Sequence, residues 1–147
     1  MEKKIHLIQE ENYDGLLIHN LTNDIQNICQ KYCSNDDKKV ELISLADNYV
    51  KIIKMLKREN PNMEIYVSMV MARFDHIDDL ENTDGKNIVN IEILKKLHRE
   101  NQVTLMSNDF LKPCDFIEEG RKKFHLSRFG FVKMCNKWKT EIEKKFD

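Results

Sequence analysis

The chain has 147 residues, 41% of them hydrophobic, and a formal net charge of −1 at pH 7. That length suits one modest core, and no long polar or Gly/Ser-rich linker divides the chain, so we expect a single domain over residues 1–147. No apolar run has the length of a signal peptide or a membrane span, and four cysteines without a C-x-x-C pair suit a reducing compartment. We therefore expect a soluble, cytoplasmic protein without a membrane partner.

Charge is distributed unevenly along the chain. Residues 121–147 hold nine lysines and arginines against three acidic residues, a charge of +6, which leaves −7 on the part before them. A basic segment of this kind suits an anionic partner, and it equally suits a solvated helix face. RNA is therefore one partner to be considered, through residues 121–123, Arg128 and Lys133.

The predicted elements alternate between helix and strand. Residues 2–11, with Ile5 and Ile8 one turn apart, predict a short helix, and residues 14–20 contain an apolar run that suits a buried parallel strand. The remaining elements follow from apolar residues at strand or helix spacing: strands at 64–70 and 103–106, and helices at 25–32, 38–59, 88–97 and 131–142.

Strands that alternate with helices imply right-handed parallel crossovers. The expected fold class is therefore α/β, a small three-layer sandwich whose short parallel sheet of about three strands is flanked by helices. Asn20 and residues 22–24 follow the first strand at its carboxyl end, where open α/β sheets usually bind their ligands.

Three other sets of residues can be read as sites. Cys29 and Cys33 stand at i and i+4, but structural zinc sites normally have paired, closely spaced ligands, so we interpret them as core cysteines. The acidic loop expected at 75–87 lacks the ligand spacing of a calcium loop. Ser68 has no nucleophile elbow around it and is interpreted as a packing residue. No metal and no cofactor is expected.

Several short motifs resemble those of the SGNH, or GDSL-type, hydrolases. Thr22-Asn23-Asp24 after the first strand is similar to the family's Gly-x-Asn-Asp block, and Ser68 with residues 73–75 is similar to the end of its next strand. Asn90 matches an asparagine near the start of the following family helix. His125-Leu126-Ser127-x-x-Gly130 is similar to the family's closing Asp-x-x-His-Leu-Ser/Asn-x-x-Gly block. The resemblance covers nearly the whole chain and implies the later part of the family fold, without its first strands.

The resemblance implies catalytic roles for two residues. In the family the asparagine donates to the oxyanion and the histidine is the general base, and these positions are Asn23 and His125. The serine of the Gly-Asp-Ser block and the second-block glycine have no counterpart, Leu21 replaces the third-block glycine, and Lys122 replaces the orienting acid. Because covalent catalysis needs the attacking atom, we expect Asn23 and His125 to be vestigial.

The missing front part has a predicted consequence for strand 14–20. In the family's flavodoxin-like order this strand is the third and pairs with the first. Without the first strand it becomes an open edge with unpaired backbone groups. We expect that edge to be covered by the N-terminal segment, by a second copy of the chain as in a homodimer, or by another polypeptide.

Three functions are compatible with the sequence. The first is an SGNH-hydrolase-like remnant or pseudoenzyme without esterase activity, serving as a binding module. The second is a serine esterase or acylhydrolase whose Gly-Asp-Ser block lies upstream or in another chain. The third is a protein- or RNA-interaction domain in which the motifs are only turn and packing features.

Overall fold

The sheet consists of three parallel strands in chain order. The structure, a computed structural model, describes residues 13–71, 80–117 and 125–146. Its strands are β1 (Gly15–His19), β2 (Glu64–Ser68) and β3 (Val103–Met106), in the order β1-β2-β3. The expected α/β class and parallel sheet are confirmed, and the helix expected at 2–11 lies outside the described residues.

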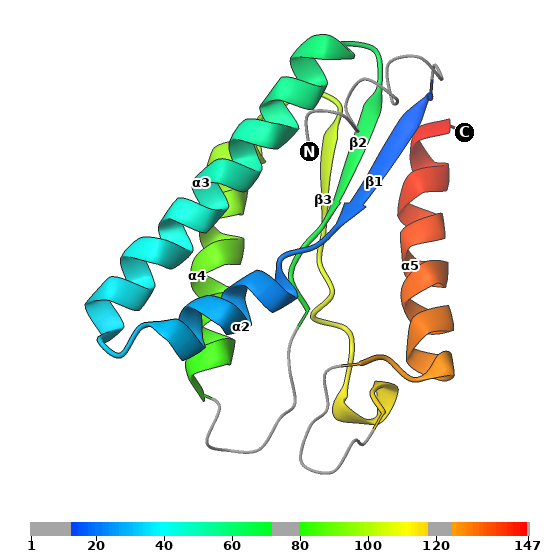
Figure 1. The fold of residues 1–147 in the computed structure, drawn as a ribbon. Coiled ribbons are helices and arrows are strands. Elements are labelled where there is room, and N and C mark those ends of the chain that lie inside the picture. Colours follow the sequence, from blue (N-terminus) through cyan, green and yellow to red (C-terminus); the bar gives the residue numbers. More distant parts are fainter. Residues whose placement is uncertain (1–12, 72–79, 118–124, 147) are drawn as a thin grey trace.

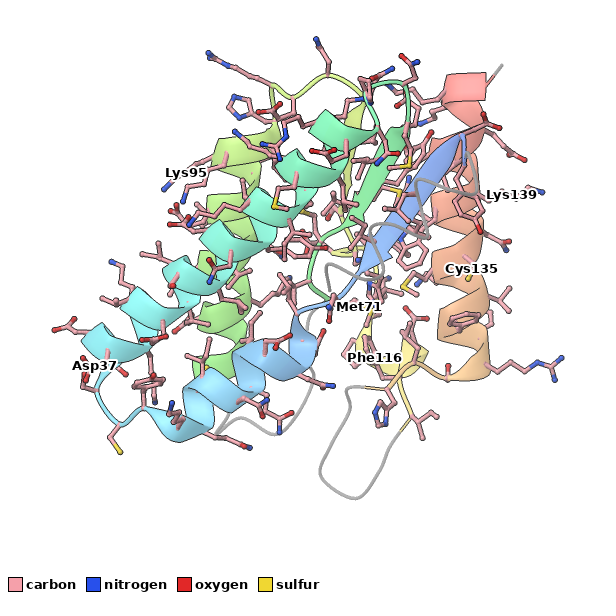
Figure 2. The ribbon with its side chains drawn as sticks, turned by 45° about the horizontal axis from the view of Figure 1, so that its top comes forward. Asp37, Met71, Lys95, Phe116, Cys135 and Lys139 are labelled. Atoms are coloured by element: carbon pink, nitrogen blue, oxygen red, sulfur yellow. The ribbon has the colours of Figure 1, made fainter. Side chains whose placement is uncertain are left out.

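The helices form one layer on each face of this sheet (Figure 1). α2 (Thr22–Lys31), α3 (Asn35–Glu59) and α4 (Leu80–Leu97) lie on one face, and α5 (Arg128–Phe146) lies on the other. A 3-10 turn, η2 (Pro113–Asp115), precedes α5. Figure 2 shows Lys95 of α4 and Lys139 of α5 pointing into solvent on opposite sides of the molecule. In the described part of the chain, no helix is long and apolar enough to cross a membrane.

Two apolar clusters hold the three layers together. The larger lies between the sheet and α2, α3 and α4, and it includes Ile65 and Val67 of β2. The smaller lies between the sheet and α5, and it includes Tyr66, Met106 and Trp138. Successive residues of a strand point to opposite faces, so the uninterrupted apolar run of β2 supplies both clusters.

Both long helices begin earlier than expected: α3 begins at Asn35 instead of residue 38, and α4 begins at Leu80 instead of residue 88. Ser34 Oγ accepts a hydrogen bond from Asp37 N at 3.1 Å, the N-cap that starts α3. α4 begins at Leu80, so the prediction of a loop was wrong for residues 80–87. A Cβ on Gly85 would lie 2.9 Å from Ile25 Cγ2, so the glycine allows α4 to lie close against α2. Residues 75–79 lie outside the described residues.

β1 is an edge strand of the described sheet. Leu16 and Ile18 pack against the larger cluster. By the alternation of a strand, Gly15, Leu17 and His19 point to the α5 side. Leu17 is 40% exposed there, so the cover that α5 gives to β2 and β3 does not extend fully over β1.

Candidate functional site

A hydrogen-bond network joins the carboxyl ends of the three strands to α5. Ser68 ends β2, and its Oγ lies 2.8 Å from Nδ1 of His19, which ends β1. Asn108 follows β3, and its side-chain nitrogen donates to Ser68 Oγ at 2.8 Å and to the carbonyl oxygen of Met69 at 2.5 Å. Its side-chain oxygen accepts from Trp138 Nε1 at 3.1 Å. We call His19, Ser68, Asn108 and Trp138 the strand-end network.

Three of these four side chains are shut off from solvent. Ser68 is 2% exposed, Asn108 1% and Trp138 7%, whereas His19 is exposed. The His19 ring lies tilted against the Trp138 ring, with 5.3 Å between centroids. The register of the sheet pairs His19 with Ser68, which places their side chains next to each other on the α5 face. Within the strand-end network, His19 is therefore the residue that a ligand at this edge can contact.

The surroundings of His19 suit a neutral ring. Ser68 Oγ accepts from Asn108, and we assign the hydrogen of this hydroxyl to His19 Nδ1, which can accept it only in the neutral ring. Burial of part of the ring lowers the pKa of His19 below 6.5. A serine hydroxyl and a histidine nitrogen lie at a similar distance in hydrolytic triads.

Asn23 lies just beyond the carboxyl end of β1 and is exposed in the first turn of α2. Leu21, in the position of the family glycine, has a φ of 84° and is 5% exposed. This left-handed conformation favours glycine and costs a leucine roughly 1–2 kcal/mol. The backbone before Asn23 therefore has the shape that a glycine would adopt most easily.

The segment from His125 to Gly130 starts α5. Ser127 Oγ accepts from Gly130 N at 3.1 Å and donates to the carbonyl oxygen of Asp115 at 2.9 Å. A Cβ on Gly130 would lie 2.0 Å from that same oxygen, so only glycine fits there. His125 is exposed, and its carbonyl oxygen accepts from Ile117 N at 2.8 Å. The Ser-x-x-Gly spacing thus fastens the start of α5 to η2.

The start of α2 and the start of α5 both lie beyond the carboxyl ends of the strands (Figure 1). Asn23 and His125 therefore belong to the same edge of the sheet, on different elements. The strand-end network runs through neither of them. Lys122 and residues 73–75, which also belong to the resemblance, lie outside the described residues.

A buried carboxylate next to the start of α5 was not predicted. Asp115 is 0% exposed, and its Oδ2 accepts from Lys133 Nζ at 2.6 Å and from Lys112 N at 2.7 Å. The hydrogen bond from Lys133 and then that from Lys112 lower the pKa of this carboxyl below 3.8. Lys133 is 18 residues away in the chain, so no local spacing could have indicated the pair.

The side chain of Asn90 connects α4 to the backbone just after β2. It lies within α4, not at its start, and its side chain accepts from Val70 N at 2.9 Å and donates to Val70 O at 3.1 Å. The N–H and C=O of Val70 lie beyond the end of β2, and the Asn90 side chain supplies both with a hydrogen-bond partner. The side chain therefore attaches α4 to the carboxyl edge.

Within the described ranges, no group of three or more His, Cys, Asp and Glu side chains could hold a metal ion. Comparison with models of known protein families, with curated proteins and with solved structures gives no match. Function has to be inferred from the residues of this chain.

Proposed function

We propose that this chain is an SGNH-hydrolase-like domain that has no esterase activity of its own and serves as a binding module. Parallel strands in chain order agree with the later strands of the flavodoxin-like order. The conformation of Leu21 and the position of Asn23 after β1 also support the proposal. The segment from His125 to Gly130 supports it less specifically, because its contacts have a purely structural explanation.

Burial of Ser68 is the observation on which the lack of activity rests. Its hydroxyl has a histidine partner, yet the residue is 2% exposed, so an ester carbonyl cannot approach the oxygen. Ser107, after β3, is exposed but donates to Asp109 at 2.9 Å, and a carboxylate of this kind is a weak base for a serine. Ser127 is used as the cap of α5. None of these three serines at the carboxyl edge combines exposure with a histidine base.

An assay with p-nitrophenyl acetate tests this part of the proposal. The full chain should hydrolyse the ester no faster than buffer with an equal amount of an unrelated protein. Ser68→Ala and His125→Ala should leave that rate unchanged. Turnover above background that is abolished by either substitution would support the esterase alternative instead.

The basic character of α5 gives less support to RNA as the ligand. Lys133 pairs with Asp115, Lys137 lies 3.6 Å from Glu141, and Lys139 lies 3.5 Å from Glu143. These pairs fit the solvated helix face that was the alternative interpretation. RNA binding would still be recognisable by a steep fall in affinity with added salt, since phosphate contacts release counterions.

The four cysteines support a proposed location in a reducing compartment such as the cytoplasm. All four lie in the described ranges, and they form no disulfide with one another. Cys29 is buried as expected, whereas the interpretation of Cys33 as a core cysteine was wrong, because Cys33 is exposed. An oxidising environment would modify exposed Cys33 and Cys114 most readily.

A further inference from the structure

Along the outer edge of β1, the backbone groups of alternate residues have no strand partner among the described residues. Glu64 N donates to the carbonyl oxygen of Asp14 at 3.0 Å, so Asp14 directs its backbone groups toward β2. Backbone groups alternate in direction along a strand, which leaves three residues whose N–H and C=O point away from β2: Gly15, Leu17 and His19. β2 is the only strand paired with β1 in the described sheet.

This edge lacks the usual protection against strand pairing. Natural edge strands carry charges, proline or a bulge that prevents another strand from adding. Residues 15–18 read Gly-Leu-Leu-Ile and contain neither charge nor proline, and all five residues of β1 pair with β2 in an unbroken register. Leu17 is also 40% exposed on the α5 side. The strand is therefore a ready template for another strand.

We propose that β1 pairs with β1 of a second copy of this chain, antiparallel about a two-fold axis at Leu17, to form one continuous six-stranded sheet. Identical edges can meet in this way because a two-fold interface is self-complementary. Hydrogen-bonded pairs exchange two bonds each, so the three outward residues would contribute about six backbone hydrogen bonds.

The side chains of β1 suit this register. Leu17 lies beside Leu17 of the second copy, where two half-exposed leucines cover each other. Gly15 lies opposite His19, so the residue without a side chain faces the one ring-bearing residue of the strand. On the other face Leu16 lies opposite Ile18, in the closely spaced type of pair that favours apolar contact. A shift along the strand leaves at least one outward residue without its partner, which disfavours other registers.

This dimer does not depend on the proposed function, because it rests only on the edge and the register of β1. Two other occupants of the edge, a segment of the same chain and a different polypeptide, make different predictions in the experiments below. Both would leave the purified chain monomeric.

Cysteine cross-linking tests the register directly. Leu17→Cys, in a background with Cys33→Ser and Cys114→Ser, should give a covalent dimer on mild oxidation. The Cα atoms of a hydrogen-bonded antiparallel pair lie ~5.5 Å apart, within the range that a disulfide spans. Val40→Cys in the same background is the matched control, because Val40 lies on α3 and is 65% exposed. It should give only the trace of dimer seen in the background itself.

Light scattering coupled to size-exclusion chromatography tests the interface without cysteines. The wild-type chain should elute as a dimer that dissociates on dilution, and Leu17→Lys should raise the dissociation constant at least about tenfold because it places two cations together at the axis. The circular dichroism of that variant should be unchanged. A wild-type monomer at all concentrations, or cross-linking of Leu17→Cys no greater than that of Val40→Cys, would overturn the proposal.

Discussion

His19 Nδ1 and Ser68 Oγ lie 2.8 Å apart across the ends of β1 and β2. The distance is that of a catalytic pair, but the environment differs from that of a catalytic pair. Buried Asn108 donates to the serine oxygen, and Trp138 lies against the histidine ring. The contact therefore joins the two strands to α5, and it leaves only the histidine exposed for a ligand.

The protonation of His19 follows from this arrangement. Burial disfavours the charged ring, so its pKa in the folded chain should lie below 6.5. The unfolded chain then binds the proton more readily. The contribution of His19 to the free energy of unfolding should be complete above pH 6.5 and should be lost as the pH falls through the folded pKa.

An NMR titration of the imidazole proton resonances, with His19→Gln to assign the His19 signal, measures this pKa. Ser68→Ala should raise it, because the hydroxyl that donates to the neutral ring is gone. A folded-state pKa above 6.5 would contradict the effect of burial, and a pKa that Ser68→Ala leaves unchanged would contradict the assigned hydrogen-bond direction.

Asn108→Ala should destabilise the chain by about 2–4 kcal/mol, because it removes three hydrogen bonds and leaves the indole N–H of Trp138 buried without its acceptor. Urea denaturation followed by tryptophan fluorescence gives the change in the free energy of unfolding. Asn136→Ala, at an exposed position of α5, is the control and should change it by less than about 0.5 kcal/mol. Equal effects of the two substitutions would show that the network contributes little.

The sheet could be predicted from the sequence, whereas the network could not. The apolar runs in β1 and β2 predict strands because a strand of this kind is recognisable from neighbouring residues alone. The network joins residues that are far apart: Ser68 is 49 residues from His19, and Asn108 is 40 from Ser68 and 30 from Trp138. The residues of the network come together through the strand register and the position of α5, and neither can be recognised from the spacing of neighbouring residues.

Local sequence patterns indicate which elements hold Asn23 and Gly130, but they do not indicate what Gly130 contacts. Asn23 does follow the first strand, and Gly130 does lie at the start of the last helix. Gly130 is required because it lies against the carbonyl oxygen of Asp115. Asp115 lies 15 positions earlier, and no sequence motif indicated it. The start of α4 was missed because its first turns are polar and contain Gly85, which locally reads as a loop.

The positive φ of Leu21 predicts an unusual order of stability for two substitutions. Leu21→Ala and Leu21→Gly both remove a buried side chain, at a cost of about 2–5 kcal/mol. Glycine also relieves the strain at a φ of 84°, so Leu21→Gly should be as stable as Leu21→Ala or up to about 1 kcal/mol more stable. Thermal or urea unfolding of both variants decides this, and an alanine variant more stable by over about 1 kcal/mol would argue against the strained conformation.

Gly130→Ala should destabilise the chain by more than about 2 kcal/mol, because the added Cβ would lie 2.0 Å from the Asp115 carbonyl oxygen and α5 would have to move. Phe129→Ala is the control on the same turn. Phe129 is 69% exposed, so its truncation should change the free energy of unfolding by less than about 0.5 kcal/mol. A Gly130→Ala variant as stable as the control would show that η2 and α5 can separate at little cost.

Asp115 should make the chain sensitive to acid. The hydrogen bond from Lys133 and then that from Lys112 hold its pKa below 3.8 in the folded chain, whereas the unfolded carboxyl titrates near that value. The folded state therefore favours the carboxylate. The stability that this preference contributes should be complete above pH 3.8 and should be lost as the pH falls through the folded pKa.

Asp115→Asn, compared with the exposed control Asp36→Asn, tests this dependence through the free energy of unfolding measured between neutral pH and pH 3 or so. The asparagine keeps the size of the side chain but loses the charge that pairs with Lys133, so stability at neutral pH should fall. Its further loss below pH 3.8 should be smaller than that of the wild-type chain. Asp36→Asn should keep the wild-type profile. A variant at Asp115 with wild-type stability and an unchanged acid profile would mean that the buried ion pair does not stabilise the start of α5.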